Sequence, residues 1–264
     1  MPEQLTEDTI SQIIRQVNAI LEEAGTTART GRTRPDVGRI PSDAPITQLI
    51  DHTQLAPDTM ARQIEMMCFE AKQHNFASIC VGSWYLPLVA ELLKDSNVTL
   101  CTVVGYPYGA SLPQVTAYAT QEAINAGARE IDMAIHIGAL KSRDLVGVFE
   151  DISDVALICH EHPDEVICKV IIETSLLTDD EKIIACQLAK QAGADFVVTG
   201  TRYDADVSVD NVRLMREVVG DGMGVKAVGD IRTLEQATAL RNAGANRLGT
   251  THGVIIAQEI ASQA

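Results

Sequence analysis

Three charged side chains lie inside short β-branched runs of this 264-residue sequence, where apolar residues are usual. Lys169 stands in VICKVII (166–172), Asp132 in EIDMAI (130–135) and Lys226 in GVKAV (224–228). Because side chains alternate across a strand, each of these residues points away from the face of its apolar neighbours. A buried charge without a partner is costly, so the pattern indicates either chemistry or a structural Lys–Asp ion pair between strands.

The chemistry that fits these residue types is amine catalysis. A lysine in a low-dielectric site, or beside a second cation, has a lowered pKa and is partly the free amine at neutral pH. A free amine attacks a carbonyl and gives an iminium ion, and a nearby aspartate moves the protons. The pattern predicts that Lys169 is the nucleophile and that Asp132 is the acid/base group. It leaves Lys226 open between a catalytic and a structural role.

The elements that must position these residues form a regular series. Eight short β-branched runs alternate with amphipathic segments, which indicates parallel strands and right-handed crossovers. The alternative is an open doubly wound sheet, but the eight units and the absence of G-x-G-x-x-G after the first run favour an α/β fold of the TIM (β/α)8 barrel type. Active sites of such barrels lie at the C-terminal ends of the strands. The runs cover 46–51, 76–81, 98–104, 130–135, 166–172, 195–199, 224–228 and 246–250.

An additional N-terminal helix precedes the barrel. Its apolar residues recur at helical spacing from Ile10 to Leu21. A polar segment rich in Gly, Pro, Ser and Thr follows it. We therefore expect an N-terminal helix over 1–25, a linker or loop over 26–44 and a catalytic barrel over 45–264. The helix is expected to cap a barrel end or to pack on a second subunit, which leaves a homodimer open.

Composition limits the class of protein. The chain is 46% hydrophobic and 22% charged, and its formal net charge of -15 disfavours nucleic acid and anionic membranes as partners. The six cysteines form no C-x-x-C pair and lie largely in apolar runs, which is typical of reduced thiols in a cytoplasmic protein. Neither a membrane-spanning run nor a signal peptide is evident, and no metal-ligand cluster is present. We expect no metal and no cofactor.

Several other polar and aromatic residues are expected to be structural. His52 lies on the face opposite to Asp51 and is interpreted as a core histidine. His74 is expected near a helix end, where a cation suits the helix dipole. Trp84 and Tyr85 are predicted to begin a helix and to belong to the core, with Trp84 at the rim of the site as the alternative.

The motifs resemble the deoxyribose-phosphate aldolase family, which comprises class I aldolases on TIM barrels. The resemblance extends from about Ile50 to Gly253. The segments that carry it are IDHTQLAPD (50–58), ASICV (77–81), CTVVGYPYGA (101–110), AGAREIDMAIHIGALKS (126–142), KVIIETSLLTDDEK (169–182), AGADFVVTGT (192–201), VKAVGDIRT (225–233) and RLGTTHG (247–253).

The resemblance implies roles by position. It implies a carbon–carbon lyase that needs no cofactor and acts on a small aldehyde or sugar. Lys169 matches the Schiff-base lysine, Asp132 the acid/base aspartate, and Lys226 a family lysine on the seventh strand, which we include among the catalytic residues. Substrate-binding positions are implied at Asp51, Thr53, Cys80, Thr199, Thr201, Arg202, Gly229, Asp230, Gly249, Thr251 and His252.

The sequence also departs from the family pattern. Where the family reads K-T-S-T-G, residues 198–202 read VTGTR, so Val198 stands at the position of a second catalytic lysine. Lys226 or Tyr203 is the candidate to compensate. Arg202 and Asp230 replace glycines of the phosphate-binding loops, and Asp230 opposes phosphate unless it pairs with Arg202 or His252.

These departures keep two alternatives to the aldolase open. One is a Schiff-base enzyme of the same fold, a dehydratase or transaldolase-like, acting on a non-phosphorylated or carboxylated substrate, for which Arg202 is suited. The other is a non-catalytic homologue.

Overall fold

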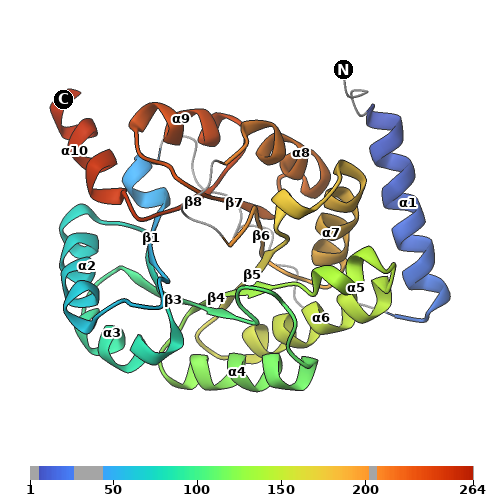
Figure 1. The fold of residues 1–264 in the computed structure, drawn as a ribbon, viewed down its shortest axis with the longest axis horizontal. Helices are drawn as coiled ribbons and strands as arrows, with labels where there is room; N and C mark the ends of the chain where they lie inside the picture. Colours follow the sequence, from blue (N-terminus) through green and yellow to red (C-terminus); the bar gives the residue numbers. More distant parts are fainter. Residues whose placement is uncertain (1–5, 27–43, 202–206, 264) are drawn as a thin grey trace.

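The computed structural model describes residues 6–26, 44–201 and 207–263. Eight parallel strands close into a barrel in chain order, with β8 paired to β1 (Figure 1). The predicted TIM barrel is confirmed. The first run departs most from its prediction, because Ile46–Leu49 form a 3-10 turn and the strand begins after it. The strands are β1 (Ile50–Gln54), β2 (Ser78–Val81), β3 (Thr99–Val104), β4 (Glu130–Ala134), β5 (Ile167–Ile171), β6 (Phe196–Val198), β7 (Gly224–Val228) and β8 (Arg247–Thr250).

Helices surround the barrel on the outside (Figure 1). Several begin at a side-chain cap: Thr178 and Glu181 form a capping box at one helix, and Thr233 and Gln236 form one at another. Such caps satisfy backbone N–H groups that the first turn leaves free. The helices are α1 (Glu7–Glu23), α2 (Ala61–His74), α3 (Leu86–Leu92), α4 (Pro113–Asn125), α5 (Ile137–Lys141), α6 (Leu145–Glu161), α7 (Asp179–Gln191), α8 (Val209–Val219), α9 (Leu234–Asn242) and α10 (Gly253–Gln263).

The two faces of each strand separate as their alternation predicts. Ile131 and Met133 of β4 and Val170 of β5 are fully buried in the core between the barrel and its helices. Asp132 lies between Ile131 and Met133 in the sequence, and Lys169 directly precedes Val170. The side chains of Asp132 and Lys169 contact each other inside the barrel. The inward direction predicted for both residues is therefore confirmed.

Helix α1 packs on the outer wall of the barrel rather than over one of its ends. It lies against α7 and α6, and Ile10, Val17 and Leu21 are buried there. The Gln187 side-chain amide donates to the Asn18 side-chain oxygen at 2.7 Å. The expectation that this helix caps a barrel end is wrong, because its apolar face is covered by the chain's own helices. Most of the predicted linker, residues 26–44, lies outside the described residues.

All six cysteines are free and buried, as predicted. Within residues 6–26, 44–201 and 207–263, none of the helices combines the length and the apolar character that crossing a membrane requires.

The residues expected to be structural have mixed outcomes. His52 is buried, and its Nε2 lies 2.9 Å from a carboxylate oxygen of Glu70, as expected of a core histidine. His74 is in the last turn of α2. Trp84 is 86% exposed, so its assignment to the core is wrong. It lies in the 3-10 turn Ser83–Tyr85, where the neighbouring Tyr85 turns inward and donates its hydroxyl to the Thr59 carbonyl.

Candidate active site

Inward-facing residues of five strands form what we call the charged layer of the barrel. Carboxylates and cations are equal in number, so their formal charges cancel. Such mutual compensation is what permits charges in a water-poor interior. The layer consists of Asp51 on β1, Glu130 and Asp132 on β4, Lys169 on β5, Lys226 on β7 and Arg247 on β8.

Lys169 is held deep in this layer. Its Nζ lies 2.6 Å from Glu130, 3.0 Å from Asp132 and 3.3 Å from Asp51, and its side chain is 0% exposed. Burial alone acts to lower the pKa of Lys169, but the negative charges around it outweigh burial and hold that pKa well above its ordinary value. The expectation of a lowered pKa is therefore wrong, because the sequence did not reveal how many carboxylates surround this amine.

Lys226 approaches the same acids from the other side. Its Nζ lies 2.7 Å from Asp51 and 2.7 Å from Asp132. Burial acts to lower its pKa, but these carboxylates raise it above the ordinary value. The stem of Lys226 passes Gly249, where a Cβ would lie 3.1 Å from the lysine Cε. Gly249, expected to bind substrate, thus gives room to this lysine.

Arg247 lies on the N-terminal side of the layer. It donates to Asp51 at 2.5 Å and to Glu130 at 2.7 Å, and its guanidinium lies over the Phe196 ring, 5.9 Å from the centroid. Sequence reasoning missed this residue. The alternation of NRLGT (246–250) could have found it, because Arg247 and Gly249 share the inward face.

The acids of the layer are stabilised as carboxylates. Burial acts to raise the pKa of Asp132, yet the two lysine ammonium groups outweigh it and lower that pKa. Asp51 behaves in the same way, with Arg247 adding to the lysines, and its pKa is lowered well below the ordinary value. Asp132 is thus held as a carboxylate between two buried amines.

The next inward-facing side chains, two residues closer to the C-terminal ends of β4 and β5, are apolar. Ala134 on β4, Ile171 on β5 and Val198 on β6 pack together, with Tyr106 and Val228 against them. We call these five residues the apolar layer. Val198 is fully buried, and in the sheet it is the register partner of Lys226. A side chain at position 198 therefore lies among apolar groups, beside a strand that carries a cation.

The threonines that follow β6 make internal contacts. Thr199 Oγ1 accepts from the Val228 N–H at 2.9 Å. Thr201 is held at three atoms: Glu173 accepts from its N–H at 2.8 Å and its hydroxyl at 2.6 Å, and Tyr106 donates to its carbonyl at 2.9 Å. Glu173 does this from a left-handed backbone conformation, with φ of 56°. Both threonines were expected to bind substrate, and in this structure they fix the segment after β6.

A closed parallel barrel with two lysines and an aspartate inside it is the architecture of a known family of aldolases. The family model for DeoC/LacD family aldolases matches residues 46–262. The chain belongs to the DeoC/LacD family of aldolases.

Individual relatives agree with this family. Deoxyribose-phosphate aldolase 1 of Bacillus licheniformis is 49% identical over 212 residues, which are 80% of this chain and 94% of that one. Deoxyribose-phosphate aldolase of Bdellovibrio bacteriovorus is 49% identical over 214 residues, 81% and 96% of the two chains. A crystal structure of a candidate deoxyribose-phosphate aldolase from Coccidioides immitis superposes with a TM-score of 0.80 at 32% identity and covers 98% of this chain and 99% of its own.

The loops after β7 and β8 carry the polar residues expected to contact the substrate's far end. Asp230 accepts from Arg232 Nε at 2.7 and 2.8 Å, and its carboxylate lies 3.6 Å from His252 Nδ1. Thr251 Oγ1 lies 3.2 Å from the same ring nitrogen. The expected pairing of Asp230 is thus met by His252 and also by Arg232, which had not been considered. Arg202 and Tyr203 lie outside the described residues.

Cys80 and Thr53 lie inside the barrel, as expected of residues that line the site. Thr53 on β1 and Cys80 on β2 are register partners in the sheet, and both side chains are buried. Cys80, Cys101 and Asp132 have ligand atoms within 4.8 Å of one another. The Lys169 ammonium lies 3.5 Å from Cys101 Sγ and 3.0 Å from Asp132, so a fixed positive charge opposes a metal ion at this place.

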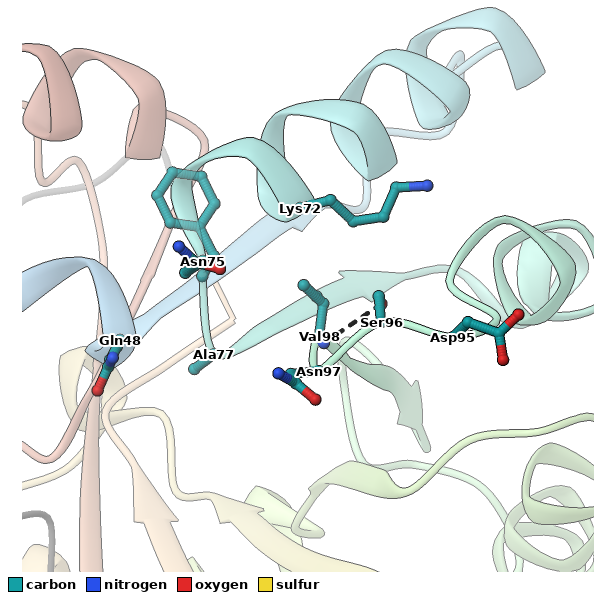
Figure 2. A pocket seen from close by; sticks show the side chains of 9 residues that line it. Gln48, Lys72, Asn75, Ala77, Asp95, Ser96, Asn97 and Val98 are labelled. Atoms are coloured by element: carbon teal, nitrogen blue, oxygen red, sulfur yellow. Dashed lines mark hydrogen bonds between the residues drawn. The ribbon is translucent and has the colours of Figure 1, made fainter.

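A separate cavity of about 500 Å³ lies at the N-terminal ends of the first strands. Figure 2 shows Gln48, Asn75, Asn97 and Lys72 around it. Its residues precede β1, β2 and β3, so it opens at the end of the barrel where catalytic residues of this fold do not lie. The inward lysines are not among the residues that line it.

Proposed function

We propose that this chain is a class I aldolase of the deoxyribose-phosphate type. It forms a Schiff base between a lysine and a small carbonyl donor, and it makes or cleaves the neighbouring carbon–carbon bond. The observation that carries the proposal is the triad of Lys169, Asp132 and Lys226, whose charged atoms lie within 3.0 Å of their partners inside a barrel of this aldolase family.

We infer that Lys169 is the reacting amine, as its match to the Schiff-base position implies, and that Lys226 assists it. The two lysines are alike in position, because each is the third residue of a five-residue strand that pairs with β6. Asp132 lies 3.0 Å from the Nζ of Lys169 and 2.7 Å from the Nζ of Lys226, so it is placed to exchange a proton with either amine.

The reaction follows from these contacts. Asp132 accepts a proton from the Lys169 ammonium, which lies 3.0 Å away, and the amine adds to the donor carbonyl to form a carbinolamine. Loss of water gives the iminium ion, which loses an α-proton to become an enamine. The enamine carbon attacks the acceptor aldehyde, and water then releases the product and restores the amine. Because the pKa of Lys169 is raised, the free amine is scarce at neutral pH, and the rate of adduct formation rises with pH.

Borohydride trapping tests the proposal. The chain is incubated with acetaldehyde and sodium borohydride at several pH values, and the N-ethyl-lysine is located by peptide mass spectrometry. We expect the adduct at Lys169, and we expect Lys169→Met to lose it while the wild-type protein and an exposed-site control, Lys190→Met, retain it. An adduct at Lys226 instead would assign the nucleophile there. No adduct at either lysine would reject the Schiff-base mechanism.

A non-catalytic barrel is the second candidate, and two observations favour it. Val198 is apolar at the position to which the resemblance assigns a second lysine, and the carboxylates around Lys169 and Lys226 raise the pKa values of both amines. This candidate predicts no adduct with acetaldehyde even at alkaline pH, where the proposed aldolase reacts fastest. The same trapping experiment therefore separates the two.

A further inference from the structure

One ion pair of the charged layer takes no part in the proposed reaction. Arg247 and Glu130 are the first residues of β8 and β4, so they lie on the side of the layer away from the end where substrate enters barrels of this fold. The Arg247 guanidinium donates to both carboxylate oxygens of Glu130, at 2.7 and 3.2 Å. It also donates to Asp51 at 2.5 Å. A bidentate contact of this kind holds the Glu130 carboxylate in one orientation.

Arg247 keeps its positive charge in this interior. Its side chain is 12% exposed, and that of Glu130 is 1% exposed. Burial acts to lower the pKa of Arg247, but the carboxylates of Glu130 and Asp51 outweigh burial and raise that pKa. The guanidinium also lies over the Phe196 ring, 5.9 Å from its centroid, and a ring face attracts a cation. Carboxylates and an aromatic ring therefore fix this cation in place.

Glu130 connects this arginine to the amine of Lys169. Its carboxylate lies 2.6 Å from the Lys169 Nζ, which is the shortest of the three carboxylate contacts of this lysine. Burial acts to lower the pKa of Lys169, and the carboxylates raise it. Glu130 raises that pKa less than Asp132 and Asp51 do, although it lies nearest. Both Glu130 oxygens face Arg247, so less of the carboxylate charge remains to hold the lysine as an ammonium ion.

We propose that Arg247 is a positioning residue that acts through Glu130: it holds this carboxylate and compensates its charge, so that Lys169 releases its proton more readily. The inference rests on the proposed function in taking Lys169 as the amine that must lose a proton. The compensation between Arg247 and Glu130 does not depend on that function. The other charged or titratable groups around Lys169 are Asp51 on β1, Cys80 on β2, Cys101 on β3, Asp132 on β4 and Lys226 on β7.

Removal of either partner should change the reactivity of Lys169 in opposite directions. The rate of borohydride trapping with acetaldehyde is measured on the full chain at several pH values, and the adduct is located by peptide mass spectrometry. Arg247→Met leaves Glu130 uncompensated, so we expect the adduct at Lys169 to form about tenfold more slowly at each pH, as a pKa raised by about one unit requires. Glu130→Gln removes one carboxylate beside the amine, so we expect about tenfold faster formation. Slower reaction in both variants would indicate a structural role only and would overturn the proposal.

Three further variants separate charge from structure. Arg247→Lys keeps the positive charge and should keep the wild-type pH profile. Arg247→Met combined with Glu130→Gln removes one charge of each sign, so its rate should return toward that of the wild-type protein. Arg129→Met is the matched control, because Arg129 binds Asp164 at 2.5 Å where both side chains are partly exposed, and it should react as the wild-type protein does. A double variant as slow as Arg247→Met would overturn the route through Glu130.

Urea unfolding at neutral pH supplies a second arm that needs no aldehyde. The loss of unfolding free energy in the double variant should be smaller than the sum of the two single losses, because the second substitution removes the charge that the first left unpaired. A loss equal to the sum would overturn the compensation. If Arg247→Met does not fold, Glu130→Gln must still speed the reaction and Arg247→Lys must keep the wild-type profile, and failure of either overturns the proposal. If no protein gives an adduct, the proposed function fails, and the unfolding cycle still decides whether Arg247 compensates Glu130.

Discussion

The charged layer and the apolar layer share strands β4, β5 and β7, where their members lie two residues apart. On β4 Asp132 is followed by Ala134, on β5 Lys169 by Ile171, and on β7 Lys226 by Val228. Each pair points inward, yet one member is bound by opposite charges and the other by hydrocarbon.

This difference shows that the chemistry of a buried lysine depends on its layer. In the charged layer carboxylates outweigh burial and raise the lysine pKa. In the apolar layer the neighbours are Ala134, Ile171, Val198, Tyr106 and Val228, so burial among them would lower the pKa of an amine.

The largest effect is expected from removal of a charge from the charged layer. Lys169→Met should lower the free energy of unfolding by about 3–5 kcal/mol, because it leaves three buried carboxylates short of one cation. Urea unfolding measures this. The control is Lys141→Met, since Lys141 pairs with Glu181 at 2.9 Å but is 42% exposed. That loss should be about 0–1 kcal/mol. Equal losses in the two variants would show that the layer is not a strongly coupled network.

The opposite change is the addition of an amine to the apolar layer. Val198→Lys places a lysine among Ala134, Ile171 and Val228, beside the ammonium of Lys226, and both surroundings lower its pKa. A pKa lowered by about two units raises the free amine about a hundredfold at neutral pH. We therefore expect borohydride trapping with acetaldehyde to proceed about a hundredfold faster, with the adduct at residue 198.

Val198→Met is the control for this gain. It fills a similar space without an amine, so it should react as the wild-type protein does. Circular dichroism checks that both variants are folded, since overpacking of a core costs about 1–3 kcal/mol. Adduct formation at the wild-type rate in folded Val198→Lys would contradict the assignment of this layer as a place that activates amines.

Most of the barrel could be predicted from sequence, because its signals are local. Alternation within EIDMAI and VICKVII was sufficient to direct Asp132 and Lys169 inward. The charge state of Lys169 could not be predicted in the same way, because it depends on Glu130, Asp51 and Asp132, which come from other strands. The sequence shows on which face of its strand a side chain lies. It does not show how many charged side chains from other strands meet it there.

The errors outside the barrel have a similar cause. Trp84 was assigned to the core from its residue type, but a 3-10 turn rotates it to the surface and buries part of Tyr85 instead. Asp230 and Arg232 are two residues apart, so their ion pair could have been predicted from the sequence. The hydrogen bond between Glu173 and Thr201 could not be predicted from the sequence. It joins two loops, and it depends on the left-handed backbone conformation of Glu173.

The next effect is the pH dependence of stability, which should come from the charged layer and not from the apolar layer. The pKa values of Asp51 and Asp132 are lowered, so their contribution is complete above the ordinary value of 3.8 and is lost as pH falls below it. The pKa values of Lys169 and Lys226 are raised, so their contribution is complete below 10.5 and is lost as pH rises beyond it. Stability from this layer should therefore hold from about pH 4 to about pH 10.

Urea unfolding across this range checks both limits. Val198→Met changes only the apolar layer, so its stability curve should be displaced without a change in either pH limit. Lys169→Met should show an earlier loss on the alkaline side or a smaller total change, because one of the titrating partners is gone. Parallel curves for all three proteins would mean that these four groups do not govern the pH limits.

The smallest effect is expected from a single methyl group of the apolar layer. Ile171→Val should cost about 0.5 kcal/mol, at the low end of the range for this change, because Ile171 faces the C-terminal end of the barrel. Ile131→Val on the helix-facing side is the matched control and should cost about 1 kcal/mol, since its side chain is enclosed by core residues. A larger cost at Ile171 would mean that the apolar layer is packed as tightly as the core. A substrate would then have to displace side chains before it could reach Lys169.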